Sequence, residues 1–274
     1  MKIIDYINAD NISNEIASVL YIDNNYFNKY LKTTVSSKKL YEEGSLNNKN
    51  PIIFLTKIEY LHELNNKVLC NLKKKFIIIT HYGDLRAGRF PNIIDNPFLI
   101  RWYGINMNLN NEKLYGLPIG LETKYWNRTN TLIIDKLSSI KKNKLLYLNF
   151  SNTNQKRPKI MKELIKKGFI RSEKLKWEEY MADLASHKFC ISPQGNGIDC
   201  HRTWECLYLG VIPIVEKSIA LEYFKELPIL FVENYNQITK DFLEQKYKEF
   251  SRIKFNKEKL KLSYWKNRIF NEFL

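Results

Sequence analysis

Long apolar runs are missing from this sequence of 274 residues. No stretch reaches the roughly 18 consecutive apolar residues that a membrane-spanning helix needs. The first residues, MKIIDYINADNIS, also lack the apolar core of a secretory signal peptide. We therefore expect a cytoplasmic protein without a transmembrane helix.

Cysteine is scarce, and its spacing is uninformative for cross-linking. The 4 cysteines stand at positions 70, 190, 200 and 206, without a Cys-x-x-Cys pair. We interpret them as reduced thiols of a cytosolic protein. Internal repeats and low-complexity tails are absent as well, so nothing indicates a repeat architecture.

The composition that remains is typical of a folded globular protein. Hydrophobic residues make up 44% of the chain and aromatic residues 14%. Two domains of about 130 residues each fit within this length. We place the boundary at a lysine-rich segment, which predicts an N-terminal domain over 1–140 and a C-terminal domain over 141–274.

Acidic residues are few compared with basic ones, 29 against 44, and the net charge is +15. Nucleic-acid binding is one interpretation of such a charge. The lysines are spread along the chain, however, and no nucleic-acid-binding motif accompanies them, so we expect no nucleic-acid partner. A basic surface would suit an anionic glycan or peripheral contact with an anionic membrane leaflet.

The first half of the chain alternates apolar, β-rich runs with helical patterns, which indicates an open α/β sheet. Strands are expected at 51–55, 76–80, 99–103 and 114–119. Polar residues follow two of these runs: His81 and Asp84 follow one, and Glu122 follows another. Because ligands of such sheets bind beyond the carboxyl ends of the strands, these three side chains are candidates for chemistry. A loop histidine and a turn aspartate are the plainer alternatives.

The stretch FCISPQGNGIDCHRTWECLYLGVIPIVE, residues 189–216, has the strongest pattern in the chain. It predicts a strand, a glycine loop with Gly195 and Gly197, a helix over 200–209 and a second strand over 211–215. Gly210 is a natural residue to follow the helix. Two strands joined by one helix indicate a βαβ unit with parallel strands.

The predicted helix carries charged residues beside the glycine loop. His201, Arg202 and Glu205 share one arc of it, while Trp204, Leu207 and Tyr208 share another that should pack on the sheet. A helix N-terminus with an arginine suits a phosphate, and a carboxylate one turn further on could accept hydrogen bonds from ribose.

Two other interpretations of this helix stay open. Arg202 and Glu205 could form an ordinary surface ion pair at i,i+3 spacing. Alternatively, Gly195-Asn196-Gly197 with Glu216 could be part of a dinucleotide fingerprint, which would make the protein an NAD(P)-dependent oxidoreductase. Cys200 then stands where that fingerprint has its third small residue.

A second anion-binding candidate follows the strand expected at 145–150. Ser151, Asn154 and Arg157 lie in a polar loop that leads into a helix. A simple helix cap, with Pro158 in the first turn, explains the same residues equally well.

The motif SPQGNGIDCHRTWECLYLGVIPIV, residues 192–215, resembles the donor-binding motif of the exostosin-like glycosyltransferases. A weaker similarity, through Thr80-His81-x-x-Asp84, RWY and LPIGLE, extends it over most of 51–235. The resemblance implies a GT-B-like fold, in which two Rossmann-like domains face each other across a cleft. It also implies a UDP-sugar donor, with Arg202 at the diphosphate and Glu205 at the ribose. Gln194 departs from the family pattern, which usually has arginine there.

From the motif and the second loop together we expect a donor-binding set of Ser151, Asn154, Arg157, Gly195, Asn196, Gly197, Asp199, His201, Arg202 and Glu205. The acceptor would be a glycan or a glycolipid. An inverting transferase needs a general base opposite the donor, and the candidates in order are Asp84, His81 and Glu122. No Asp-x-Asp motif occurs, so we expect no metal or other cofactor, with Arg202, His201 and the helix N-terminus stabilising the leaving diphosphate.

Overall fold

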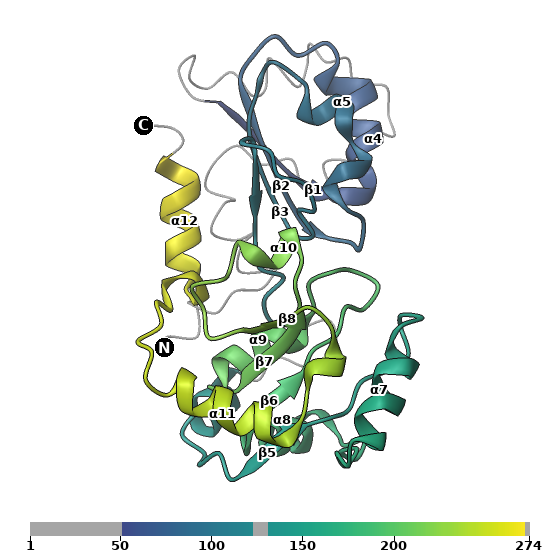
Figure 1. Ribbon diagram of the computed structural model, residues 1–274. Coiled ribbons are helices and arrows are strands. Elements are labelled where there is room, and N and C mark those ends of the chain that lie inside the picture. The colour runs from purple at the N-terminus through teal and green to yellow at the C-terminus, as the bar shows by residue number, and fades with distance from the viewer. Residues whose placement is uncertain (1–50, 123–130, 272–274) are drawn as a thin grey trace.

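The computed structural model describes residues 51–122 and 131–271, and it places them in two parallel four-stranded sheets (Figure 1). The first sheet contains β1 (Ile52–Lys57), β2 (Phe76–Tyr82), β3 (Leu99–Gly104) and β4 (Leu114–Gly116) in that order. The second contains β5 (Lys144–Tyr147), β6 (His187–Ile191), β7 (Ile212–Glu216) and β8 (Leu230–Val232), also in chain order. The predicted α/β class, with two Rossmann-like domains, is confirmed.

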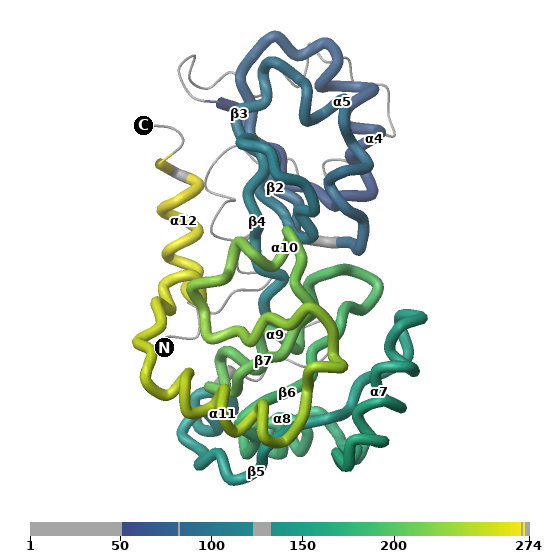
Figure 2. Tube along the Cα trace, viewed as in Figure 1, coloured from purple at the N-terminus to yellow at the C-terminus, as the bar shows by residue number. Residues whose placement is uncertain are grey.

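Short helical pieces connect the strands of the first sheet. They are η3 (Ile58–Tyr60), α4 (Leu61–Leu64), η4 (Asn65–Leu69), η5 (Ala87–Arg89) and α5 (Pro91–Ile94). The helical spacing of apolar residues over 58–68 predicts one helix that runs to about residue 74. The structure has instead three consecutive helical segments of different type that end at Leu69. α4 and α5 lie on one side of this sheet, and the last helix of the chain lies on the other (Figure 2).

The second domain has both short helical segments and longer helices, of up to 11 residues. They are α7 (Arg157–Lys166), α8 (Trp177–Ala185), α9 (His201–Tyr208), α10 (Ile219–Glu222), η7 (Tyr235–Gln237), α11 (Lys240–Phe250), η8 (Glu258–Leu260) and α12 (Leu262–Phe270). The βαβ unit predicted around the glycine loop is present as β6, α9 and β7, and its two strands pair in parallel from Phe189 opposite Ile212.

Some predicted boundaries were wrong for local reasons. β4 stops at Gly116: the Leu117 N–H still donates to the carbonyl oxygen of Gly104, but the Ile119 N–H donates to Asp199 instead. The lysine-rich segment where the boundary was placed, 141–144, leads into β5 and follows α6 (Thr131–Leu137). The helix ends where Ser138 and Ser139 donate hydrogen bonds back to helix carbonyl oxygens. The predicted boundary at 140 lies between α6 and β5. The sequence also predicts a short helix over 16–21, which lies outside the described residues.

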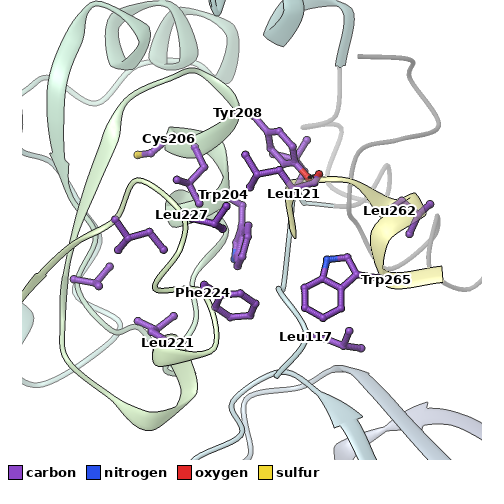
Figure 3. Close-up of a cluster of buried hydrophobic side chains, with 14 of the residues drawn as sticks. Leu117, Leu121, Trp204, Cys206, Tyr208, Leu221, Phe224, Leu227, Leu262 and Trp265 are labelled. Carbon is purple, nitrogen blue, oxygen red and sulfur yellow. Dashed lines mark hydrogen bonds between the residues drawn. The ribbon is translucent and has the colours of Figure 1, made fainter. Parts of the chain in front are cut away.

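Each sheet has its own hydrophobic core, and a third cluster joins the two domains. Figure 3 shows the centre of this joint, where Trp204 of α9 faces Phe224 and where Leu117 approaches Trp265 of α12. The ring of Phe224 lies 4.9 Å from that of Trp204 and 6.2 Å from that of Trp265. The apolar arc of α9 therefore packs into the joint between the domains and not on its own sheet alone.

Candidate functional site

The glycine loop between β6 and α9 is held by side chains from both domains. Cys200 caps α9 in an extended conformation, and its N–H donates to Asp199 Oδ1 at 2.8 Å. At the other end of the helix Gly210 takes a φ of +69°, which the absence of a Cβ permits, and the chain then enters β7. This short, closed helix fixes the positions of His201, Arg202 and Glu205.

Asp199 ties this loop to the first domain. Its Oδ2 accepts a hydrogen bond from the backbone N–H of Ile119 at 2.8 Å, and both oxygens accept from Trp204 Nε1 at 2.9 Å. Burial raises the pKa of Asp199 to about 6. Its oxygens are occupied by the protein, so Asp199, predicted to bind the donor, shapes the loop in this structure.

Asn106 makes the second tie between the domains. Its Oδ1 accepts hydrogen bonds from the N–H groups of Ile198 and Asp199, at 2.8 and 2.9 Å. The residue is buried and has a φ of +57°, a left-handed conformation that asparagine tolerates better than most residues. Asn106 was not among the predicted site residues. The available signal was a polar residue soon after the end of a strand, the same signal that singled out Asp84.

His201 points toward the first domain. Its Nδ1 lies 2.8 Å from the carbonyl oxygen of Gly120 and donates to it, and its Nε2 lies 3.5 Å from Glu122 Oε1. The structure therefore pairs Glu122, predicted as a possible base, with His201, predicted to bind the donor.

His81 is the penultimate residue of β2 and does not follow the strand as predicted. It is buried, and its Nε2 donates to the carbonyl oxygen of Pro118 at 2.8 Å. Burial lowers the pKa of His81 to about 4, although the bond to Pro118 opposes this and the charge of nearby His201 adds to it. The ring is therefore neutral at pH 7 and has a weak affinity for a proton.

Asp84 is exposed and lies close to the glycine loop of the other domain. Its Oδ1 is 3.3 Å from the point where a side chain on Gly197 would begin. An exposed carboxylate from one domain thus faces the loop that the sequence assigned to the donor.

Arg202 points the other way from His201, toward the carboxyl end of β5. Its guanidinium donates to the carbonyl oxygen of Asn149 and lies over the rings of Tyr147 and Tyr180, at 5.8 and 5.3 Å. Glu205 is buried and accepts a hydrogen bond of 2.5 Å from the hydroxyl of Tyr180. The predicted single polar arc is thus divided, with His201 on one side and Arg202 and Glu205 on the other. Nothing in the local sequence pointed to Tyr180.

Arg157 acts as a clamp on the two loops that approach α9. Its guanidinium donates to the carbonyl oxygens of Ser151, Pro193 and Gln194 at 2.8–2.9 Å, and Asn154 Nδ2 donates to the carbonyl oxygen of Gly195 at 3.0 Å. Burial lowers the pKa of Arg157. The predicted anion-binding loop is therefore joined to the glycine loop, with the arginine holding carbonyl oxygens in both.

These contacts bring most predicted residues into two neighbouring groups around α9. Asp84, Glu122, Gly197, Asp199 and His201 lie at its N-terminal end, between the domains. Ser151, Asn154, Arg157, Gly195, Arg202 and Glu205 lie around the carboxyl edge of the second sheet. Asn196 is exposed on the loop, and no contact recorded in the described residues assigns it to either group.

Within the described residues, no group of three or more histidine, cysteine, aspartate or glutamate side chains is arranged to hold a metal ion. Nor does any helix in 51–122 or 131–271 combine the length and apolar character needed to cross a membrane.

Comparisons with known proteins do not identify a family for this chain. No protein-family model matches the chain, and no curated protein does. Solved structures that it resembles include an alpha,alpha-trehalose-phosphate synthase (UDP-forming) from Burkholderia vietnamiensis, which is 9% identical. That likeness covers 92% of this chain and 80% of the synthase chain, with a TM-score of 0.42. A similarity at this level says nothing about the activity of this chain.

Proposed function

We propose that the protein is an inverting glycosyltransferase that moves a sugar from a UDP-sugar to a hydroxyl group of a glycan or glycolipid. The observation that carries this proposal is the placement of two kinds of side chain around one short helix. Arg202 lies at the carboxyl edge of the second sheet, and the exposed carboxylate of Asp84 reaches the N-terminal side of the same helix from the first domain. The transfer requires a cation beside the donor diphosphate and a base beside the acceptor hydroxyl, and we assign these roles to Arg202 and Asp84.

On the donor side, Arg202 would bind the diphosphate and Glu205 the ribose. The Arg202 guanidinium uses one N–H group on Asn149 and stacks over two tyrosines, so its orientation is fixed before any ligand arrives. Tyr180 donates to one Glu205 oxygen, which fixes the carboxylate and leaves the other oxygen to accept a hydroxyl. The charge that develops on the leaving UDP would be stabilised by Arg202 and the N–H groups of the first turn of α9, with no metal required. His201, predicted to share this role, points to the other side of the helix.

On the acceptor side, Asp84 is the preferred base among the three predicted candidates. His81 is buried with its pKa lowered to about 4, and Glu122 faces His201. Asp84 would take the proton of the acceptor hydroxyl as its oxygen bonds to the sugar carbon, while the bond from that carbon to the diphosphate breaks and UDP leaves with the electron pair. Glu122 would hold the His201 ring in place.

Calorimetry with UDP, GDP, CMP and NADH tests the donor assignment. We expect UDP to bind and NADH not to bind. Binding of NADH without UDP would instead support the oxidoreductase interpretation of the glycine loop, and salt-sensitive binding of RNA would support the nucleic-acid interpretation.

Substitutions then test the roles, with release of UDP from a panel of UDP-sugars as the assay. Arg202→Ala should lower kcat by about 10²–10³-fold, or about 2–4 kcal/mol, the scale of losing one preorganised donor.

Glu205→Gln should mainly raise the KM for the donor. Asp84→Asn should lower kcat with little change in UDP affinity. The exposed Arg252 and Asp241 provide matched controls, as Arg252→Ala and Asp241→Asn. Parent-like turnover by Arg202→Ala would refute the site.

A further inference from the structure

The helix α7 and the turn that follows it concentrate the positive charge of the chain. Residues 156–171 include seven lysines and arginines and one acidic residue, Glu163. These 16 residues therefore carry a net charge of +6, out of +15 for the whole chain. The helix lies at the outer edge of the second domain, where its free face is open to solvent (Figure 1).

The outward face of α7 combines lysines with an isoleucine. The helix buries Ile160 and Leu164 in the core of the second sheet. At 100° per residue, five exposed residues share an arc of about 120° on the opposite side. They are Pro158, Lys159, Lys162, Ile165 and Lys166. Lys159 lies 4.0 Å from Glu163, and no ion pair among the described residues involves Lys162 or Lys166.

The turn after α7 directs a second isoleucine outward. Gly168 takes a φ of +80°, and the N–H groups of Gly168 and Phe169 donate to the carbonyl oxygens of Ile165 and Leu164. Phe169 is buried by this turn, while Ile170 is 86% exposed and Ile165 is 46% exposed. These two isoleucines are half of the four large apolar side chains that the described residues expose.

We propose that Pro158, Lys159, Lys162, Ile165, Lys166 and Ile170, the α7 surface, bind an anionic membrane leaflet. The lysine ammonium groups attract the phosphates and other anionic groups of the lipids. The two isoleucines then enter the boundary between headgroups and acyl chains, which removes their apolar area from water. Charge and apolar exposure on one face are thus both satisfied by a single partner.

Other partners fit the α7 surface less well. A single-stranded nucleic acid is bound by basic residues together with exposed aromatic side chains on which bases stack, and the α7 surface has no aromatic residue. A nucleic acid would also leave the isoleucines in water. A second copy of the chain that used the same face would bring lysines against lysines, which repel each other.

The α7 surface is rigidly connected to the glycine loop. Arg157, the first residue of α7, donates to the carbonyl oxygens of Pro193 and Gln194 in that loop. A membrane bound at the α7 surface therefore holds the glycine loop at a fixed place relative to the leaflet. The inference goes beyond the proposed function, because binding of lipid by the outer face does not require UDP or a transfer reaction.

Flotation of the full chain with lipid vesicles tests the proposal. We expect the protein to float with phosphatidylcholine vesicles that contain about 30% phosphatidylserine and not with phosphatidylcholine alone. Added salt should weaken this binding, because it screens the lysines. Failure to float with the anionic vesicles, or equal flotation with both kinds, would overturn the proposal.

The apolar contribution is tested by Ile165→Ser combined with Ile170→Ser, which leaves the charge unchanged. We expect the partition coefficient onto anionic vesicles to fall by about 10-fold or more. Ile253→Ser is the matched control, since Ile253 is 52% exposed between Arg252 and Lys254, beyond the end of α11. A double variant that partitions like the parent would show that the isoleucines do not contact lipid.

The charge contribution is tested by Lys162→Glu combined with Lys166→Glu. We expect a fall in the partition coefficient of about 10-fold or more. Lys248→Glu combined with Lys254→Glu is the control, because both lysines are exposed and the net charge changes by the same amount. Equal losses in the two pairs would mean that net charge alone attracts the protein, and the α7 surface would be rejected.

Hydrogen exchange of the parent protein covers the case in which a variant does not fold. Anionic vesicles should slow exchange of the backbone amides over 165–171 and leave those over 250–256 unchanged, whereas unchanged exchange over 165–171 would reject the surface. If RNA displaced the parent from vesicles and the isoleucine variant bound vesicles normally, the face would be a general polyanion site instead. Failure of the glycosyltransferase proposal looks different, since UDP binding would be absent while vesicle binding remained.

Discussion

At the scale of single residues, two arginines near the glycine loop have opposite surroundings. Arg157 directs its guanidinium at three carbonyl oxygens, so it is committed to the protein. Arg202 binds one carbonyl oxygen and otherwise lies over aromatic rings, which leaves N–H groups for a ligand. The two side chains have the same chemistry, and their neighbours alone decide which one holds the loop and which one keeps N–H groups for a ligand.

His81 predicts a pH dependence of stability. Its pKa is lowered from 6.5 to about 4 by burial, so the unfolded chain binds more protons than the folded protein between these values. The stability from the neutral ring is complete above pH 6.5 and is lost as the pH falls towards 4, by about 3 kcal/mol in total. Urea unfolding of the parent and of His81→Gln at several pH values would show this, because the variant should lose less stability over that range.

Asp199 contributes with the opposite sign, since its pKa is raised from 3.8 to about 6 and its protonated form favours the folded state. The difference between parent and variant removes this shared contribution. Equal slopes for the two proteins between pH 6.5 and 4 would show that His81 does not titrate as its burial implies.

At the scale of elements, the β-rich runs and the glycine loop were predictable because their signals are local. Runs such as Ile77-Ile78-Ile79 become buried strands, and Gly210 ends α9 with a positive φ, as its place in the sequence indicated. The ties of Asn106 and Asp199 were not predictable, because their partners lie 92, 93 and 80 positions away in the chain. Periodicity carries no information about which distant residues will meet. For the same reason Arg157 was expected at an anion and was found at carbonyl oxygens.

Arg157 holds the loop after β5 and the glycine loop together, so we expect Arg157→Lys to destabilise the protein. An ammonium group has no planar fork of N–H groups, so it cannot serve the carbonyl oxygens of Ser151, Pro193 and Gln194 together. We expect a loss of about 2–4 kcal/mol in the free energy of unfolding, from one buried and two half-buried carbonyl oxygens left without donors. Urea unfolding would measure it, with the exposed Arg252→Lys as control. An effect no larger than that of the control would mean that the loops hold their shape without Arg157.

At the scale of the whole molecule, α12 fastens the two domains together. Trp265 is buried, and its ring lies 6.1 Å from Tyr115 of the first domain and 6.2 Å from Phe224 of the second. The guanidinium of Arg268, in the same helix, lies 4.2 Å from the centre of the Tyr115 ring. The end of the described chain thus packs against both halves of the fold.

Trp265→Ala should therefore destabilise the protein by about 3–5 kcal/mol, the usual cost of removing a large buried aromatic side chain. Because the lost contacts join the domains, we also expect urea unfolding followed by circular dichroism to change from one transition towards two. Ile253→Ala is the control, since Ile253 is 52% exposed. A single transition with an unchanged midpoint would show that α12 contributes little to the joint.

The close approach of Asn106 to Gly197 has a consequence for how this protein can change over evolution. The two positions are 91 residues apart in the chain, yet a Cβ on Gly197 would stand 2.8 Å from the Asn106 amide. A side chain at 197 therefore requires Asn106 to shift or to be replaced by a smaller residue, and either change would disturb its hydrogen bonds to the N–H groups of Ile198 and Asp199. Among descendants of this sequence, glycine at 197 and asparagine at 106 should be kept together or lost together.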